Sequence, residues 1–369
     1  MDKDTLFSSF GKWVTPLNSV KFTQRIEEMK QDKYTKKLTT KAYLLLFLHA
    51  QLQQREGLRA IADDALLDDF QRELGLTSIS ASQLSRKHRQ VKPELLAEIF
   101  LDLVNQIRQM STNSSSQVSG LKIVDSTTIS LNLKKYQWAT FRKTKSGIKV
   151  HLRLVFVNED TVYPEKMVMT PAGNNDRTQM EQLIDETDAM YVFDRGYVDY
   201  EKFDYYCDKG LFFASRLKKN AYVRFLESFS VPSNSSILSD SMVVIGTPQK
   251  RTENVFRLIE TFDSDGNRIR IITNRFDLDP EELGDIYRSR WAIELFFKWI
   301  KQRLTLKHLY GTSPEAVENQ VYLALISYCL LILIQLEMKS KHSLTQIYRW
   351  LRVFLWKPST VWVERIQRE

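Results

Sequence analysis

The spacing of hydrophobic residues predicts two kinds of structure along this chain, with a change near residue 115. Residues 39–54 are rich in apolar side chains, and residues 95–110 carry apolar side chains three and four positions apart, as an amphipathic helix does. Residues 58–90 predict two further helices, which the turn Gly-Leu-Thr-Ser at 75–78 separates. We therefore expect a helical N-terminal domain over residues 1–115.

After the Ser-rich segment 111–120, which we interpret as a linker, β-branched and apolar runs alternate with helical patterns. This alternation favours an α/β fold with a sheet layer. Residues 217–273 are mainly β in character, and Asp279 followed by Pro280 predicts the start of a helix that runs to about residue 304. A proline at 314 starts another helix. The expected strands are 121–131, 150–157, 166–169, 190–193 and 211–216, and the expected helices between them are 178–188 and 200–208.

Membrane and metal signals are weak. Residues 321–336 are strongly apolar, but this run is shorter than the ~20 residues that a bilayer needs and contains Ser327 and Gln335, so we expect a buried core helix with no membrane contact. The first residues lack the pattern of a signal peptide. Two Cys and five scattered His supply neither a disulfide framework nor a structural zinc ribbon. We expect a cytoplasmic protein.

Positive charge is concentrated in a few places. The net charge is +8, and residues 131–153 contain seven basic side chains and no acid. A second run, 288–307, contains six basic side chains and one acid, Glu294. Each run has two interpretations, a solvated face or a surface that binds phosphates. The helix predicted before residue 90 is likewise either a basic surface helix or the recognition helix of a helix-turn-helix. The candidate DNA contacts from these segments are Arg86, Lys87, Arg142, Lys145 and Lys149.

Three acids are candidates for chemistry. Asp125 follows an apolar run within a predicted strand, and Asp194 ends another, where α/β sheets place their sites; each is also compatible with a simple turn or cap. On a continuous helix, Glu294 would share an arc of about 60° with three other polar side chains, Tyr287, Arg290 and Lys301. A carboxylate flanked by cations suits phosphoryl transfer on DNA. The alternative is a solvated helix with a salt bridge from Glu294 to Lys298.

The four helix residues have the spacing Y-x2-R-x3-E-x6-K, which resembles the Y-R-E-K signature of insertion sequence 4 family transposases. The segment Asp-Arg-Gly-Tyr at 194–197 is similar to the second-aspartate motif of that family, and Val-Asp-Ser-Thr at 124–127 is similar to the first. The resemblance runs from about residue 6 to the C-terminus.

This resemblance implies an RNase H-like catalytic core with a β-rich insertion, in which Asp125, Asp194 and Glu294 hold Mg²⁺, with Mn²⁺ as a substitute. It also implies that Arg290 and Lys301 hold DNA phosphates and that Tyr287 binds a phosphate or braces the helix. The implied domains are 1–115 for DNA binding, 116–216 and 274–338 for the two parts of the core, 217–273 for the insertion, and 339–369 for a helical tail.

The implied activity is a DNA transposase. It would bind the double-stranded inverted repeats that end its element, cut there and join the ends to target DNA, as a homodimer. Relatives form a DNA hairpin with a flipped base stacked on an aromatic side chain of the insertion; the candidates are Phe212, Phe213, Tyr222, Phe225, Phe229, Phe256 and Phe262. Two alternatives remain, a nuclease or resolvase without strand transfer and an inactive DNA-binding protein of the same fold.

Overall fold

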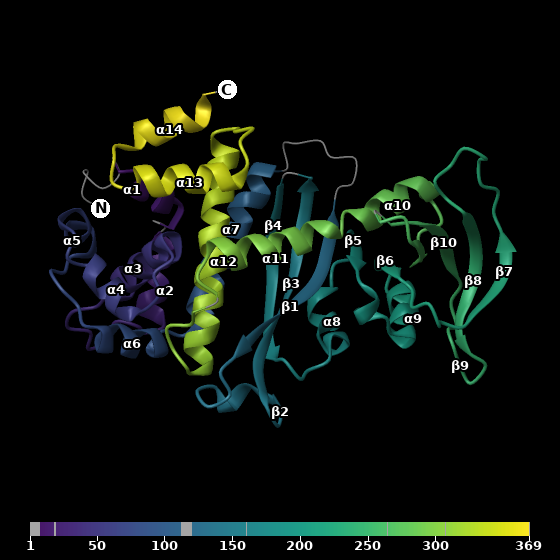
Figure 1. Cartoon of the computed structure of the whole chain (residues 1–369), viewed down its shortest axis with the longest axis horizontal. Coiled ribbons are helices and arrows are strands. Elements are labelled where there is room, and N and C mark those ends of the chain that lie inside the picture. The colour runs from purple at the N-terminus through teal and green to yellow at the C-terminus, as the bar shows by residue number, and fades with distance from the viewer. Residues whose placement is uncertain are drawn as a thin grey trace. The chain divides into compact units, whose positions relative to one another are not determined.

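The computed structural model describes residues 8–17, 20–111, 120–159, 161–263, 265–306 and 308–368, which separate into two compact units (Figure 1). The helical unit comprises the described residues of 1–114, 131–139 and 297–369, and the sheet unit those of 115–130 and 140–296. Most of the predicted linker, 112–119, lies outside the described residues. The protein is thus a mixed α/β protein with a large sheet. The C-terminal segment from Phe297 groups with the N-terminal helices.

The helical unit confirms the helical character of the N-terminal region, with one difference. Residues 58–90 form three helices, because backbone bonds from Leu66 to Asp63 and from Leu67 to Asp64 close a turn within the first predicted helix. A capping box of Ser80 and Gln83 begins the last of the three. The helices are α1 (Ser9–Val14), α2 (Val20–Glu28), α3 (Thr40–Gln53), α4 (Leu58–Asp64), α5 (Asp68–Leu74), α6 (Ala81–Gln90), α7 (Pro93–Ser111), α12 (Pro314–Glu337), α13 (Leu344–Phe354) and α14 (Ser359–Gln367), with 3-10 turns at Thr15–Leu17 and Gln137–Ala139.

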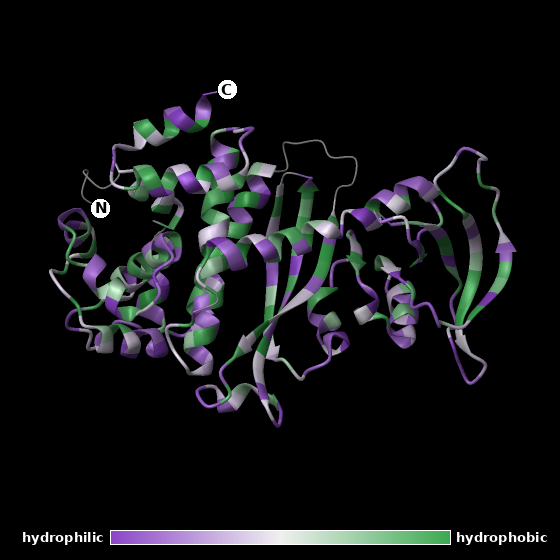
Figure 2. Ribbon diagram, viewed as in Figure 1, coloured by the Kyte–Doolittle hydropathy of each residue, from purple (hydrophilic) through white to green (hydrophobic). Residues whose placement is uncertain are grey.

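The apolar helix α12 is the core of the helical unit. Among the described residues it is the one helix long and apolar enough to cross a membrane (Figure 2), and 94% of its most apolar stretch is buried within the protein. Its buried amides bond to protein backbone: Asn319 donates to the carbonyls of His88 and Val91, at 3.0 and 2.8 Å, and Gln320 donates to that of His308 at 2.8 Å. These contacts support the prediction of a core helix.

The described strands of the sheet unit form one 11-stranded sheet in the order β2-β3-β1-β5-β6-β11-β10-β8-β7, with β4 paired to β3 and β9 to β8. The central pairs β1–β5 and β5–β6 are parallel, and the strands from β11 to β7 are antiparallel. The strands are β1 (Leu121–Leu131), β2 (Thr140–Arg142), β3 (Lys145–Asn158), β4 (Thr161–Pro171), β5 (Met190–Phe193), β6 (Phe212–Arg216), β7 (Val223–Ser228), β8 (Ser239–Thr247), β9 (Lys250–Arg251), β10 (Phe256–Phe262) and β11 (Arg268–Thr273).

Both faces of the central strands are buried, which explains their unbroken apolar runs. Tyr191 and Phe193 of β5 pack in one core cluster with Val124, whereas Met190 and Val192 pack in a second cluster on the other face. The helices of this unit are α8 (Met180–Leu183), α9 (Tyr200–Asp208), α10 (Pro280–Arg288) and the first part of α11 (Trp291–Arg303), with 3-10 turns at Asp176–Gln179 and Arg195–Tyr197.

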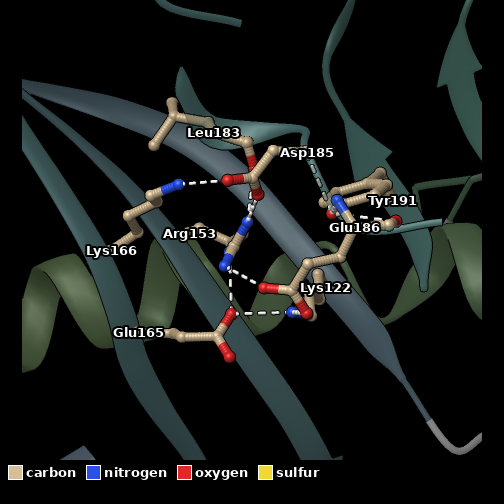
Figure 3. Close-up of polar contacts among 8 residues, drawn as sticks. All are labelled: Lys122, Arg153, Glu165, Lys166, Leu183, Asp185, Glu186 and Tyr191. Carbon is tan, nitrogen blue, oxygen red and sulfur yellow. Dashed lines mark hydrogen bonds and ion pairs between the residues drawn. The ribbon is translucent and has the colours of Figure 1, made fainter. Parts of the chain in front are cut away.

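A buried ion cluster beside β1, β3 and β4 changes two sequence interpretations (Figure 3). Arg153 pairs with Glu165 at 2.7 Å and with Glu186 at 2.6 Å, so this member of the basic run 131–153 is neutralised inside the protein. The guanidinium of Arg153 also donates a hydrogen bond to the carbonyl of Leu183. The hydroxyl of Tyr191 accepts a hydrogen bond from the N–H of Glu186 at 2.9 Å. These bonds replace helical ones, so the predicted helix 178–188 ends at Leu183. Lys122, Lys166 and Asp185 complete the cluster.

Candidate active site

Parallel pairing of β1 and β5 brings two of the predicted acids to neighbouring positions. Val124 is paired with Phe193, and the next residues along the two strands are Asp125 and Asp194. Asp125 lies within β1, and Asp194 follows the end of β5. The carboxyl ends of parallel strands are where α/β sheets place their sites, and the pairing register explains why these two acids meet.

The prediction of one continuous helix over 280–304 is wrong. Asp279 and Pro280 begin α10 as predicted, but this helix ends at Arg288 and α11 begins at Trp291. The Ser289 hydroxyl donates to the carbonyl of Ile286 at 2.6 Å, which is the carbonyl that the N–H of Arg290 would take in a continued helix. That N–H bonds to the carbonyl of Tyr287 instead. Tyr287 and Glu294 therefore belong to different helices, and the predicted single helical face does not exist.

The break places Arg290 between two of the predicted acids. Its Nη2 donates to Oε1 of Glu294 at 2.6 Å, and its Nη1 lies 3.8 Å from Oδ2 of Asp125. The Arg290 side chain is only 17% exposed, whereas that of Glu294 is 37% exposed. One guanidinium thus joins a carboxylate of β1 to a carboxylate of α11.

The pKa of Asp125 reflects its burial and the charges around it. Burial raises the pKa of Asp125 to about 6. The N–H of Ser126, which donates to its Oδ1 at 2.7 Å, and the charge of Arg290 oppose this rise, whereas repulsion from Asp194 and Glu294 adds to it. Such repulsion is felt between carboxylates that are near neighbours in a poorly solvated site.

The ring of Tyr287 lies next to the guanidinium of Arg290. Its ring is buried, and the guanidinium carbon of Arg290 lies 6.0 Å from the ring centroid. Burial raises the pKa of the Tyr287 hydroxyl to about 12, so the hydroxyl keeps its proton at neutral pH. The ring therefore holds Arg290 in place, and the hydroxyl remains a hydrogen-bond donor.

The donor set suits a hard cation. Among the described residues, no three His, Cys, Asp or Glu side chains form a preformed metal cluster. Asp125 and Glu294 instead face the guanidinium of Arg290, which shows that a positive group is held between them. All three acids offer carboxylate oxygens, the ligands that Mg²⁺ and Mn²⁺ prefer. The residue types fit a divalent ion at Asp125, Asp194 and Glu294.

Sequence reasoning missed one acid close to this site. Asp176 follows β4 in a polar turn, and its Oδ1 accepts the Ser126 hydroxyl at 2.8 Å. The same oxygen lies 3.0 Å from Nζ of Lys149, which also donates to the carbonyl of Asn174. The only signal in the sequence was an acid at the end of a Gly-Asn-Asn run, which is typical of an ordinary turn.

The structure divides the predicted DNA contacts into exposed and internally paired side chains. Arg86, Arg142 and Lys145 are exposed, and Lys301 is half-buried late in α11. Lys149 is paired with Asp176, as described above. Lys87 is buried and pairs with Asp32 at 2.7 Å, so its ammonium is engaged inside the helical unit.

Comparison with known proteins identifies the family. Residues 117–330, more than half of the chain, match the family model described as Transposase DDE domain, and residues 6–69 match a domain of unknown function (DUF4372). A Geobacillus stearothermophilus protein named as a probable transposase for insertion sequence element IS5377 is 30% identical over 295 residues, 79% of this chain and 76% of that protein. A Synechocystis sp. protein named as a transposase for insertion sequence element IS4SA is 23% identical over 293 residues, 75% of this chain and 78% of that protein.

A solved piggyBac transposase synaptic complex with hairpin DNA aligns with a TM-score of 0.47 and 8% identity, covering 98% of this chain and 82% of that one. Similarity at this level is too low to support an inference. The match to the domain model and the 30% identical relative are sufficient without it. The chain belongs to the family of transposases that carry the Transposase DDE domain.

Proposed function

We propose that this transposase is an insertion sequence 4 type enzyme of the Y-R-E-K group, which binds the inverted repeats of its element, cuts the DNA there and joins the ends to target DNA. The observation that carries the proposal is the position of Arg290 between Asp125 and Glu294, with Asp194 coupled to the same site. Three carboxylates and a phosphate-binding guanidinium are the groups that metal-dependent phosphoryl transfer on DNA requires.

An RNase H-like core is supported by the order of the strands. The hairpin β3–β4 flanks β1, and the parallel strands β5 and β6 follow on the other side. The two aspartates lie on β1 and at the end of β5, and the glutamate lies on a helix that follows the last strand. In this proposal residues 217–273, with strands β7 to β11, are the inserted segment that separates Asp194 from Glu294 in the sequence.

Divalent metal ions are the general cofactor of transposases with this domain, and we propose Mg²⁺, with Mn²⁺ as a substitute. Asp125, Asp194 and Glu294 would hold the metal, which supplies positive charge for the attacking and leaving oxygens of an in-line displacement. The contribution of the chain itself is to orient these carboxylates. Arg290, supported by Tyr287, and Lys301 would hold the phosphates of the transposon end.

DNA outside the active site would be held by exposed basic side chains. We propose Arg86 of α6 as a contact in a helix-turn-helix, and Arg142 and Lys145 of the β2–β3 hairpin as backbone contacts. Lys87 and Lys149 are less suitable, because each is already paired with an acid. Two copies of the chain would hold two transposon ends in the bacterial cytoplasm.

The exposed fractions of the aromatic side chains reduce the number of candidates for stacking on a flipped base. Phe213 and Phe256 are fully buried in the core, so they serve packing. Tyr222, Phe225 and Phe262 are between 47% and 59% exposed, and they are the candidates if this enzyme forms a hairpin intermediate.

The test uses a plasmid that carries the DNA flanking the gene, incubated with purified protein and Mg²⁺. We expect cleavage at both flanks and joined products with the wild-type protein, and neither with Asp125→Ala. Asp277→Asn, which removes an exposed acid of the same unit, is the matched control and should cut normally. Cleavage without joining would support the nuclease alternative. Specific binding without cleavage, in Mg²⁺ or Mn²⁺, would support the inactive DNA-binding alternative.

A further inference from the structure

Asp176 approaches β1 from the face opposite to the one that carries the side chain of Asp125. Successive side chains of a strand point to opposite faces, so Asp125 and Ser126 face opposite ways. Val124, on the same face as Ser126, packs in the cluster that contains Met180 and Tyr197. Asp176 lies in the 3-10 turn that precedes Met180 and accepts the Ser126 hydroxyl from that side.

Ser126 therefore connects the two acids. Its backbone N–H donates to Oδ1 of Asp125 at 2.7 Å, and its hydroxyl donates to Oδ1 of Asp176 at 2.8 Å. The first bond restrains the carboxylate of Asp125 directly. The second holds the strand at residue 126, and with it the direction of the N–H that makes the first bond.

Asp176 is itself held in position. Its carboxylate lies 3.0 Å from the ammonium of Lys149, whose side chain is only 15% exposed. The imidazole of His151 is 3.5 Å from the same oxygen, but burial lowers the pKa of His151 to about 4, so it is neutral at pH 7. Lys149 is thus the charged partner of the Asp176 carboxylate.

We propose that Asp176 is a positioning residue, which acts through Ser126 to fix the carboxylate of Asp125 in the orientation that holds the divalent ion. This inference rests on the proposed function of Asp125 as a metal ligand. Carboxylates that bind metals depend on hydrogen bonds from their surroundings, and loss of such a bond typically lowers metal affinity or activity roughly 10- to 100-fold. Lys149 belongs to this arrangement as the counter-ion of Asp176.

The variants separate the hydrogen bond from the charge. Ser126→Ala removes the link and leaves every charge in place, and Ser126→Thr restores a hydroxyl on a side chain that strands favour. Asp176→Asn keeps an acceptor for Ser126 but loses the ion pair with Lys149. Asp277→Asn is the control for loss of one carboxylate from the sheet unit, since it is 65% exposed. Thermal melting in metal-free buffer reports whether each variant is folded.

Two measurements are made on each folded variant: Mn²⁺ binding to the DNA-free protein by calorimetry, and the Mg²⁺ concentration for half-maximal end cleavage. We expect Ser126→Ala to weaken Mn²⁺ binding and to raise the Mg²⁺ midpoint, each by roughly ten-fold or more. Asp176→Asn should show a smaller shift in the same direction, whereas Ser126→Thr and Asp277→Asn should remain near the wild type. A merely structural role would lower the melting temperature without moving the metal midpoint.

The outcomes distinguish this inference from the proposed function. If the wild type binds Mn²⁺ and cuts DNA, Asp125→Ala does neither, and folded Ser126→Ala and Asp176→Asn match the wild type, then the positioning role is overturned and the proposed function stands. If the wild type neither binds Mn²⁺ nor cuts its flanking DNA, or if Asp125→Ala binds Mn²⁺ normally, both are overturned.

Discussion

Arg290 donates a 2.6 Å hydrogen bond to Glu294 across the junction between the helix break and the first turn of α11. The same guanidinium faces Asp125, so it balances charge on two sides of the site. A divalent ion bound to these acids would supply the same positive charge. Arg290 therefore has two roles in the proposed enzyme, as a counter-ion for the carboxylates and as a ligand for DNA phosphate.

The first prediction concerns Arg290→Met. Loss of the guanidinium leaves Asp125 and Glu294 without their shared cation, so in EDTA the free energy of unfolding should fall by about 1.5–3 kcal/mol, the range for hydrogen bonds to charged groups. Mn²⁺ should recover much of this loss, because an ion that binds only the folded state stabilises it. Thermal unfolding with and without Mn²⁺ measures both effects. Arg275→Met, which breaks an ion pair with the exposed Asp277, is the control, and equal Mn²⁺-induced shifts in the two variants would contradict the prediction.

The second prediction is that Glu294→Gln abolishes cleavage and leaves end binding within a few-fold. The change keeps the size of the side chain and removes the negative charge that would hold the metal, an effect of several kcal/mol, or about a thousand-fold in rate. Cleavage assays and gel-shift titrations at one stated salt concentration measure the two activities. Glu364→Gln removes an exposed acid of α14 and should retain both. Loss of specific binding in Glu294→Gln would show that the residue supports the fold instead.

The third prediction separates two neighbouring basic residues of α6. Arg86→Ala should weaken binding to the inverted repeats without changing stability, because its side chain is exposed. Lys87→Ala should lower the free energy of unfolding by about 1.5–3 kcal/mol, because it removes the buried partner of Asp32. Gel shifts and urea unfolding distinguish these outcomes. Unchanged affinity in Arg86→Ala would place end recognition elsewhere.

The fourth prediction concerns acid stability. Burial lowers the pKa of His88 to about 3, and its Nδ1 pairs with the hydroxyl of Tyr43 at 2.8 Å. The unfolded chain, with a histidine pKa of about 6.5, takes up this proton first. The contribution of His88 to stability is therefore fully present above pH 6.5 and is lost as the pH falls from 6.5 toward 3.

Urea unfolding at pH 7.5 and 5.5 tests this directly. The drop in unfolding free energy between the two pH values should be smaller in His88→Gln than in the wild type by about 1.4 kcal/mol, one proton over one pH unit. His151, whose pKa burial lowers to about 4, should account for a further part of the wild-type drop. His308→Gln, an exposed site in the same unit, is the control. An identical drop in His88→Gln and the wild type would refute the buried neutral imidazole.

Local sequence patterns predicted the elements whose contacts are close in the chain. The strand at 121–131, the helix at 200–208 and the cap formed by Asp279 and Pro280 are confirmed. These features depend on burial periodicity and on hydrogen bonds within a few residues, which a sequence shows directly. The family resemblance implied one site for Asp125 and Asp194, and the parallel pairing of β1 with β5 places these two residues at adjacent positions.

The wrong predictions depend on contacts that periodicity does not show. The helix at 178–188 ends early because Arg153, thirty residues away in the sequence, takes the carbonyl of Leu183. The pairing of Lys87 with Asp32, 55 residues away in the sequence, was likewise not visible in the pattern, and it makes Lys87 a less suitable DNA contact. The helix break at Ser289 is local, but it depends on the hydrogen bond from the Ser289 hydroxyl to the carbonyl of Ile286, which periodicity does not show. Asp176 was missed because its hydrogen bond with Ser126 of β1 joins residues that are far apart in the sequence.

The ladder that joins β6 to β11 has a mechanical consequence. Ile271 and Thr273 of β11 are in register with Arg216 and Ala214 of β6, and β6 is in turn paired with β5, which leads into Asp194. Backbone hydrogen bonds therefore link the outer strands β7 and β8, through β10, β11 and β6, to the strand before Asp194, so a displacement of the outer strands would be transmitted along the sheet toward this residue.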